Sequence, residues 1–533
     1  MCGILGIKNY NSNIDINKVS SDIIKSLINR GPDYQNYWIN KDRRTAFYHT
    51  RLSILDTSNN GNQPMFSKNK RFLMIYNGEV YNFNEIKQKL LIKGIEFKGS
   101  SDTEVILESI SALGFRKTIS ILEGMFSLGV YDLENNRIYL ARDRVGIKPL
   151  YWCKNQELFI FGSDLKAFKK SKQLNLSINN ALINSFLKYG YIPSPYTIYE
   201  NIFKLDPGNI LEYNSNGKIK IYNYIPNLHN EKKTYNYFEK KNELKNILRK
   251  SVKSSMVSDV KIGSMLSSGI DSSLITSLMQ ENNIDKVNTY TVGFDFISYD
   301  ESKYAKQISN ILGTNHNELI LTENNIKKDF FNALDSYDEP FADSSQLPTF
   351  LISKNIKKNI SVALSGDGGD EIFAGYNRYI WATKFYKFNK YSPTFLKKFL
   401  SLTTRYLSNQ NLENITSLLP QKMKINLLSN KLYKISNLFE LKDIESIYDY
   451  LITQIPNDHK ILSLKEELFI HQNYLKFDNN LDNISNMQKI DFTTYLPDDI
   501  LTKVDRASMA NSLEVRVPFL NHSVINFMNN LPL

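Results

Sequence analysis

The sequence predicts two domains, the first of α+β class and the second of α/β class. The chain has 533 residues, more than one hydrophobic core usually supports. Residues 1–215 alternate short apolar runs with turn signals, which is typical of antiparallel sheets. Residues 241–533 begin with repeats of strand, polar loop and helix, which predict a parallel sheet.

In the first domain, a turn at 132–136 predicts a hairpin, and helices are expected at 84–93 and 102–113. Residues 216–240 are polar and lack clear periodicity after a short strand, so we place the domain connection there. The predicted strands lie within residues 43–55, 72–83, 125–143 and 157–168.

In the second domain, apolar runs at 260–266, 288–294 and 360–366 are each followed by a polar loop and helical sequence. Ligands of a parallel sheet bind at the carboxyl ends of its strands, so we expect the site in these loops. Residues 380–490 are predicted as added helices.

Composition narrows the classes of function. No run approaches the roughly 20 apolar residues of a membrane span, and the amino terminus lacks a secretory pattern. Cys2 and Cys153 are the only cysteines, which excludes a disulfide framework and favours a cytoplasmic location. The formal charge of +11 comes from scattered lysines, without zinc-finger spacing or an aromatic RNA-binding motif. We therefore expect neither a nucleic-acid nor a membrane partner.

Cys2 follows the initiator methionine directly. Removal of Met1 would leave a cysteine with a free α-amino group, whose reference pKa of about 7.7 to 8.0 lies near cellular pH. That amine can act as general base for its own thiol. A cysteine at position 2 could also be accidental, so the residues that accompany it decide its role.

Several polar residues suit the hydrolysis of an amide that carries an α-carboxylate and an α-ammonium. The fork of Arg51 suits a carboxylate. The side-chain amide of Asn77 and the N–H of Gly78 suit an oxyanion hole, and Glu79 and Asp102 could hold the ammonium. Each has a simpler alternative: a surface ion pair for Arg51, a hairpin turn for Asn77–Gly78 and a helix N-cap for Asp102.

Together and in this order, these residues resemble the class II glutamine amidotransferase domain, over residues 2–170. The resemblance implies an Ntn-hydrolase-type sandwich of antiparallel sheets between helices. It also implies glutamine as substrate, with Cys2, Asn77 and Gly78 as catalytic residues. The implied glutamine-binding residues are Arg51, Asn77, Gly78, Glu79 and Asp102. The matching motifs are MCGILGI, RGPD, HTRLSIL, QPM, NGEVYN, SDTEV, GMFSLGVYD, ARDRVGIKPLYW and FGSDLKA.

The second half contains a Ser- and Gly-rich loop, Ser267–Ser273, between a predicted strand and a predicted helix. Hydroxyls, a glycine-permitted backbone and a helix N-terminus make an anion cradle, although such loops are also common linkers. Asp271 adds a carboxylate that can hold Mg²⁺ on phosphates. A Walker loop is not indicated, because the spacing Gly94–Gly99 continues with Ser100 and lacks the lysine.

This loop resembles the S-G-G-x-D-S-S pyrophosphate motif of enzymes that cleave ATP to AMP and pyrophosphate, with Ser268 at the second position of the triplet. With residues 338–350, 365–371 and 501–521, the loop makes the second half resemble the asparagine synthetase domain. The resemblance implies aspartate and ATP as substrates, a β-aspartyl-AMP intermediate and Mg²⁺. A homodimer is a possible assembly on the same grounds.

The resemblance also implies individual roles. Asp271 and Asp370 would ligate Mg²⁺. Asp367 stands where many members carry a glutamate important for forming the adenylate, and its side chain is one methylene shorter, which leaves its reach open. The implied ATP contacts are Leu266, Ser267, Gly269, Asp271, Ser272, Ser273, Val292, Ser365 and Gly366. The sequence stops at 529–533, where family members continue with a lysine-bearing segment, so we expect an incomplete carboxyl-terminal end.

Three other functions stay open at this point. The same chemistry could act on another carboxylate, such as a sugar acid in surface-polysaccharide synthesis. An amidotransferase joined to a sugar-phosphate isomerase would share the first half but would not need the pyrophosphate loop. A non-catalytic scaffold would need neither that loop nor Cys2.

Overall fold

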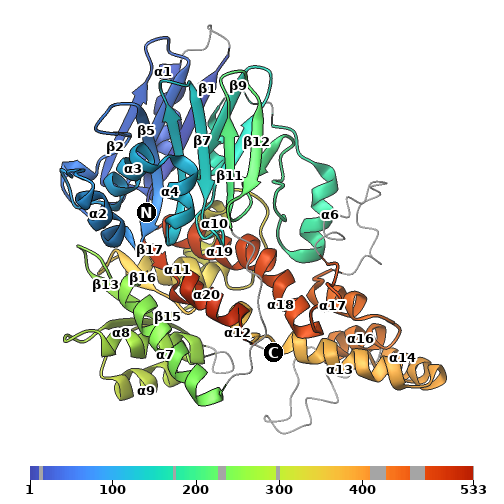
Figure 1. Ribbon diagram of the computed structural model, residues 1–533. Helices are drawn as coiled ribbons and strands as arrows, with labels where there is room; N and C mark the ends of the chain where they lie inside the picture. The colour runs from blue at the N-terminus through green and yellow to red at the C-terminus, as the bar shows by residue number, and fades with distance from the viewer. Residues whose placement is uncertain are drawn as a thin grey trace.

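The computed structural model describes residues 1–10, 16–171, 174, 176–225, 236–295, 300–408, 428–455 and 475–531. The antiparallel sheets of the amino-terminal half lie above the parallel sheet of the carboxyl-terminal half, and a helical extension lies at one side (Figure 1). The predicted α+β and α/β class is confirmed. The predicted connection at 216–240 lies partly outside the described residues.

Two six-stranded antiparallel sheets form the amino-terminal half. The first has the strand order β10-β8-β9-β1-β3-β2 and the second β12-β11-β7-β6-β5-β4. β12 extends the second sheet past residue 215, where we placed the end of the domain. The bounds in the first sheet are β1 (Gly3–Asn9), β2 (Tyr34–Ile39), β3 (Thr45–Arg51), β8 (Tyr151–Lys154), β9 (Leu158–Gly162) and β10 (Ile202–Lys204). Those in the second are β4 (Met65–Phe66), β5 (Phe72–Val80), β6 (Gly124–Asp132), β7 (Arg137–Arg142), β11 (Asn209–Tyr213) and β12 (Ile219–Asn223).

Phe161 shows why the two sheets approach so closely. Its ring lies between Gly6 of the first sheet and Gly129 of the second. A Cβ atom would lie 2.1 Å from the ring if built at Gly6 and 2.3 Å from it if built at Gly129. Phe47 packs edge-on against the same ring, with 5.5 Å between centroids. Residues without side chains therefore let an aromatic core form between the sheets.

Helices cover the outer faces of both sheets, as the resemblance implied. Buried residues of α1 (Ile16–Leu27) and α5 (Leu165–Lys170) pack on the first sheet. The second sheet is covered by α2 (Phe83–Ile92), α3 (Asp102–Leu113) and α4 (Phe115–Ile121). The helices predicted at 84–93 and 102–113 are confirmed as α2 and α3.

The carboxyl-terminal half contains a five-stranded parallel sheet of order β15-β14-β13-β16-β17. Its strands are β13 (Ile262–Met265), β14 (Asn288–Phe294), β15 (Asn315–Leu321), β16 (Val362–Leu364) and β17 (Glu514–Arg516). One core joins α7 (Tyr237–Ser255), α8 (Ile270–Glu281) and α20 (His522–Asn529) to the sheet. A second core, with Ala363 and Val515 of the strands, joins α11 (Gln346–Ile356) and α19 (Leu501–Met509) to it. The other helices of this half near the sheet are α9 (Ser302–Leu312), α10 (Glu323–Ser336) and α12 (Gly369–Phe373).

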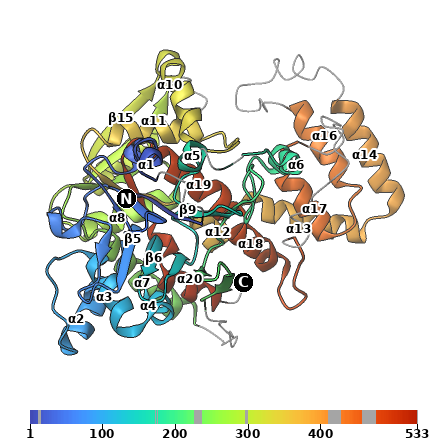
Figure 2. The ribbon, with the colours of Figure 1, turned by 90° about the horizontal axis from the view of Figure 1, so that it is seen from above.

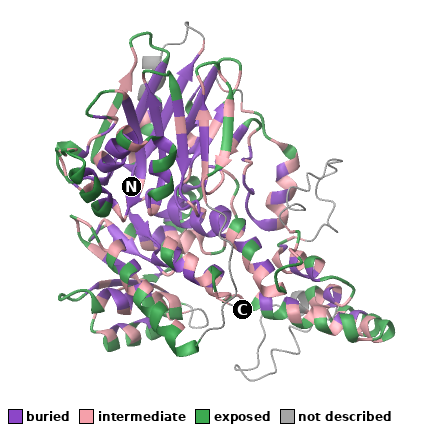
Figure 3. Cartoon of the chain, viewed as in Figure 1, coloured by how far each residue is buried: buried purple, intermediate pink, exposed green. Residues whose placement is uncertain are grey.

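Further helices form the extension, which projects away from the sheets when the molecule is seen from above (Figure 2). It has its own core, in which Tyr379, Ile447, Tyr448 and Met487 are buried. Buried residues are nevertheless densest in the sheets (Figure 3). The bounds are α13 (Asn377–Tyr391), α14 (Thr394–Ser408), α16 (Leu428–Leu438), α17 (Ile444–Ile452) and α18 (Asn483–Thr493), with α6 (Asn180–Tyr189) alongside and the π-helix η6 (Leu496–Ile500) following. The helices expected within 380–490 are confirmed where residues are described.

Among the described residues, no helix has both the length and the apolar character needed to cross a membrane.

Candidate active sites

Cys2 lies just before β1 and contacts the second sheet. Its main-chain N–H donates to Asn77 Oδ1 at 2.9 Å, and its carbonyl accepts from Arg30 Nε at 3.3 Å. Asn77 is fully buried in β5, and its Nδ2 lies 3.4 Å from Ser127 Oγ. Burial raises the pKa of the Cys2 thiol, which the nearby terminal ammonium and Arg51 oppose. The predicted nucleophile and the predicted oxyanion-hole amide therefore lie side by side.

The residues after Asn77 continue in β5, so the hairpin-turn alternative for Asn77–Gly78 is wrong. A Cβ atom at Gly78 would lie 2.1 Å from the carbonyl oxygen of Met125, so glycine lets the two strands approach. The carboxylate of Glu79 is buried and lies 3.2 Å from Arg516 Nη2. Burial raises the pKa of Glu79 well above its usual value.

Asp102 faces β5 from the first turn of α3. Its carboxylate accepts from Tyr76 Oη at 2.7 Å and from the main-chain N–H of Val80 at 3.0 Å. The N-cap of α3 is Ser101, so the capping alternative for Asp102 is wrong. Burial raises the pKa of Asp102 as well. Asp102 and Glu79 thus form a buried acidic pair, and the charge of Asp102 raises the pKa of Glu79.

Arg51 ends β3 and is buried, so the alternative of a surface ion pair is wrong. Its Nη1 donates to the carbonyl of Ser58 at 2.7 Å and to Asn62 Oδ1 at 2.8 Å. Its Nη2 donates to the carbonyls of Leu55 and Asp56. A substrate carboxylate would have to share or displace these acceptors.

The second site is a cavity of about 430 Å³ at the carboxyl ends of β13, β14 and β16. The loop Ser267–Ser273 forms part of its wall. Ser267 Oγ lies 2.8 Å from Ser272 Oγ and accepts from the N–H of Gly269 at 3.1 Å. All the predicted ATP contacts except Ser273 line the cavity; the Ser273 hydroxyl donates to the carbonyl of Gly269 at 2.7 Å.

Asp271 and Asp367 line this cavity, and Asp370 lies close to Asp271. Burial raises the pKa of Asp271, and the charges of Asp370 and Asp367 raise it further. Burial also raises the pKa of Asp370. A Cβ atom at Gly369 would lie 2.4 Å from Asp271 Oδ2, so the two loops are in direct contact. Neither Asp271 nor Asp370 is an N-cap, because Gly269 and Gly368 hold those positions.

These carboxylates fit a magnesium ion that also binds phosphates, because Mg²⁺ is usually held by one or two carboxylates plus phosphate oxygens. The charge of Asp370 raises the pKa of Asp271, and a bound cation would relieve this repulsion. Within the part of the chain that the structure describes, no group of three or more His, Cys, Asp or Glu side chains is arranged to hold a metal ion. Phosphate oxygens would therefore have to complete the ligand set.

The structure adds two cavity residues that we did not single out in the sequence. Lys503 lines the cavity, with its Nζ 3.3 Å from Asp343 Oδ2. Glu301 also lines it and accepts from Ser268 Oγ at 2.5 Å, so the serine that departs from the pyrophosphate motif has a partner. The one available signal for Lys503 was its place within the motif at 501–521.

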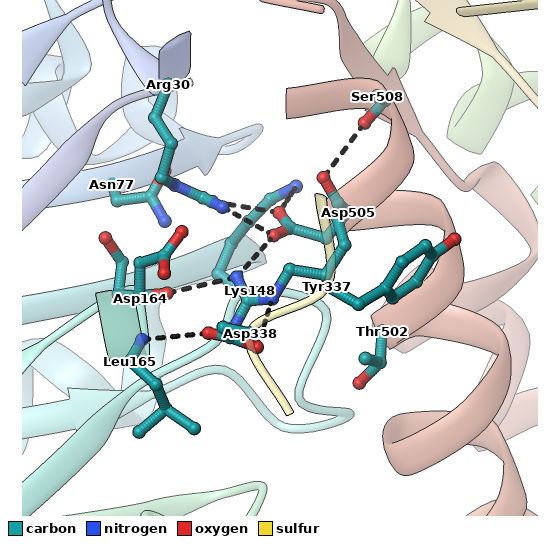
Figure 4. A network of polar contacts seen from close by, with 12 residues as sticks. Arg30, Asn77, Lys148, Asp164, Leu165, Tyr337, Asp338, Thr502, Asp505 and Ser508 are labelled. Carbon is teal, nitrogen blue, oxygen red and sulfur yellow. Dashed lines mark hydrogen bonds and ion pairs between the residues drawn. The ribbon is translucent and has the colours of Figure 1, made fainter. Parts of the chain in front are cut away.

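A network of buried charges joins the two halves between these sites (Figure 4). Arg30 forms a two-point ion pair with Asp505 of α19. Lys148 Nζ lies 3.9 Å from the same carboxylate. Arg506 lies 2.9 Å from Asp338 and donates to the carbonyl of Ser163 at 3.1 Å.

Comparison with known proteins assigns both halves. The family model described as "Asparagine synthase" matches residues 243–533, and that described as "Glutamine amidotransferase domain" matches residues 1–225. The sugar-phosphate isomerase and non-catalytic alternatives are therefore wrong. A solved structure of the allosteric regulatory enzyme of purine biosynthesis covers 60% of this chain and 80% of its own, at 15% identity and a TM-score of 0.32, too low to support an argument.

Relatives match over nearly the whole chain. Glutamine-hydrolysing asparagine synthetase 1 of Bacillus subtilis is 30% identical over 100% of this chain and 81% of its own. A relative from Methanocaldococcus jannaschii, provisionally named as a second glutamine-hydrolysing asparagine synthetase, is 33% identical over 97% of this chain and 100% of its own. The chain therefore belongs to the glutamine-hydrolysing asparagine synthetase family, whose members join an amidotransferase half to an ATP-dependent synthetase half.

Proposed function

We propose that this protein makes asparagine from aspartate, with glutamine as nitrogen donor and ATP as the activating substrate. One observation carries the proposal: a single chain holds a buried Cys2–Asn77 contact in one half and a pyrophosphate-type loop on a cavity in the other. The names of the relatives support aspartate as the acceptor.

In the first half, loss of Met1 gives Cys2 a free α-amine that takes the thiol proton. The sulfur attacks the side-chain amide carbon of glutamine, the C–N bond breaks and ammonia leaves with that proton. Water then cleaves the thioester to give glutamate. Asn77 and Gly78 stabilise the oxyanion. Arg51, Glu79 and Asp102 hold the α-carboxylate and the α-ammonium of glutamine.

In the second half, the β-carboxylate of aspartate attacks the α-phosphorus of ATP, and the bond to pyrophosphate breaks. Ammonia from the first half attacks the resulting acyl carbon, and AMP leaves. Ser267 and Ser272 would hold the pyrophosphate. Mg²⁺, when bound by Asp271 and Asp370, supplies positive charge that offsets the phosphates.

Asp367 is proposed as the carboxylate beside the reacting acyl group. Ser365 Oγ donates to Asp367 Oδ2 at 2.7 Å, which fixes the orientation of the shorter side chain. Leu266, Val292 and Gly366 line the same cavity and would contact the adenosine part. Ammonia would pass between the two sites inside the molecule, near the buried ion pair of Arg30 and Asp505 that joins the halves.

The alternative is the same chemistry on another carboxylate, such as a sugar acid. The test is product analysis with ATP, glutamine and a panel of acceptors. We expect asparagine, glutamate, AMP and pyrophosphate in equal amounts with aspartate. Pyrophosphate release that requires a different acceptor would contradict the choice of aspartate and leave the rest of the chemistry in place.

The proposed setting is a cytoplasmic homodimer without nucleic-acid or membrane partners. The part of the predicted connection at 216–240 that follows β12 would link the two domains. Both cysteines are free and buried, which supports a reducing compartment. Light scattering of the purified protein would check the dimer, since a monomer at assay concentrations would contradict it.

A further inference from the structure

Arg516 is a residue of the synthetase half that contacts the candidate glutaminase site. It lies on β17 and is fully buried. Its Nη2 lies 3.2 Å from Glu79 Oε2. Its Nε donates to Glu514 Oε1 at 2.7 Å, and its Nη1 donates to the carbonyls of Ser255 and Val257 at 3.0 and 2.6 Å. Two of its three nitrogens therefore fix the plane of the guanidinium.

The third nitrogen, Nη2, can still donate hydrogen bonds. Arg516 Nη2 is buried, yet it donates no hydrogen bond to the residues that the structure describes, despite its ion-pair distance from Glu79. A buried donor without an acceptor costs about 1–3 kcal/mol, more when it is charged. This cost would fall if a ligand or a reoriented Glu79 carboxylate accepted the N–H.

The main chain of Arg516 is hydrogen-bonded to a loop of the candidate ATP site. The N–H of Ser365, at the start of the Asp367 loop, donates to the carbonyl of Arg516 at 3.0 Å. Side chains alternate along a strand, so Glu514 and Arg516 share a face, while Val515 packs in the core with Ala363 on the other. The position of Arg516 is therefore set by the synthetase sheet.

The surroundings of Glu79 show what the arginine does there. Burial raises the pKa of Glu79, and Arg516 is the strongest opposing influence. Loss of Arg516 would therefore raise the pKa of Glu79 further, and a protonated Glu79 would no longer attract an ammonium group. The other charged or titratable groups that face Glu79 are Asp102 on α3, Glu514 on β17, Tyr76 on β5, Tyr81 after β5 and the terminal ammonium.

We infer that Arg516 is a positioning residue of the glutaminase site, which orients the Glu79 carboxylate toward the α-ammonium of glutamine. The inference rests on the proposed role of Glu79. It makes the glutaminase site a joint product of both halves, because the necessary cation comes from the synthetase sheet.

The test compares Arg516→Gln, Arg516→Lys, Glu79→Gln and the double variant Glu79→Gln/Arg516→Gln. Arg116→Gln, which removes an exposed ion pair with Glu212, is the matched control. Glutaminase kinetics and ammonia-dependent asparagine synthesis are measured on the same preparations. We expect Arg516→Gln to raise the glutamine KM about tenfold or more near neutral pH and to spare ammonia-dependent synthesis. The defect should shrink as pH rises, because without Arg516 the Glu79 carboxyl ionises at a higher pH than in the wild type.

The double variant separates the possible outcomes. If Arg516 acts through Glu79, the double variant has the KM of Glu79→Gln alone; additive losses would overturn the inference. A glutamine KM unchanged by Glu79→Gln would instead contradict the proposed role of Glu79. A large rise in the glutamine KM of Glu79→Gln without any rise in Arg516→Gln would contradict the inference about Arg516 and leave the proposed role of Glu79 in place. Should Arg516→Gln not fold, Arg516→Lys carries the test, and equal loss of both activities in it would mean a purely structural role.

Discussion

Arg30 and Asp505 form a two-point ion pair between the two halves, with Nη1 2.8 Å from Oδ2 and Nη2 3.1 Å from Oδ1. Both side chains are only 4% exposed. Asp505→Asn would leave Arg30 charged and poorly paired, so we expect the free energy of unfolding to fall by about 3–5 kcal/mol. Denaturant titration measures this change. The control is Glu96→Gln at the exposed pair with Lys68, where the change should stay below about 1 kcal/mol.

The Asp505 carboxylate should make the folded protein less stable in acid. Burial would raise the pKa of Asp505, but Arg30 and Lys148 outweigh it and lower the pKa to about 2. The unfolded chain has a pKa of about 3.9 for this group. The stabilisation is therefore complete above about pH 4 and is lost as pH falls through about 2. Unfolding free energies across this range should fall more steeply in the wild type than in Asp505→Asn; equal slopes would contradict the assignment.

Cys2→Ala should abolish glutamine-dependent synthesis, because the attacking sulfur is lost. Ammonia added directly should still support asparagine formation, since the synthetase cavity is unchanged. Mass spectrometry of active wild-type protein should show that Met1 has been removed. Equal loss of both activities in Cys2→Ala would contradict the separation of roles, and active protein that retains Met1 would contradict the N-terminal nucleophile.

Asp271→Asn and Asp370→Asn should each lose aspartate-dependent ATP–pyrophosphate exchange, because each removes a charge that we propose holds Mg²⁺ on the phosphates. Helix capping cannot account for such a loss, since glycines hold both N-cap positions. Glutaminase activity should persist in both variants and serves as the internal control. Normal exchange in both would refute the magnesium assignment.

Arg51→Ala should raise the glutamine KM strongly and leave the use of ammonia intact. A charge-assisted contact to the α-carboxylate is worth about 1.5–3 kcal/mol, or roughly ten- to a hundredfold in binding. Loss of the carbonyl contacts to Ser58 and Asp56 would also loosen the loop next to the site. Steady-state kinetics with each nitrogen source distinguish the two substrates, and an unchanged glutamine KM would give Arg51 a structural role.

The sequence predicted the elements whose signals are local. Apolar alternation and turns indicated the antiparallel half, and the loop Ser267–Ser273 lies at the carboxyl end of β13 as expected. Cys2 and Asn77 could be assigned to one site from the sequence, because each lies in a motif of the glutamine amidotransferase domain. Their direct contact, which bridges two different sheets, required the fold.

Contacts that depend on tertiary packing could not be predicted in this way. Glu79 meets Arg516 only because an amino-terminal strand lies against the end of a carboxyl-terminal sheet. Lys503 lies on the cavity wall because α19 crosses beside the sheet. Arg51 looked free to bind a carboxylate, whereas the structure surrounds its guanidinium with carbonyl oxygens from the loop that follows β3. Neither composition nor periodicity carries such information.

The position of β17 has a consequence for attempts to express the halves separately. It is the terminal strand of its sheet, and all three of its residues are buried. The amino-terminal half covers this region through the hydrogen bond from the Ser512 hydroxyl to the carbonyl of Asn29 and the ion pair of Glu79 with Arg516. Unprotected strand edges are templates for pairing with other chains. A synthetase half produced alone would expose this edge and should aggregate, whereas co-expression of both halves as separate chains should keep it soluble.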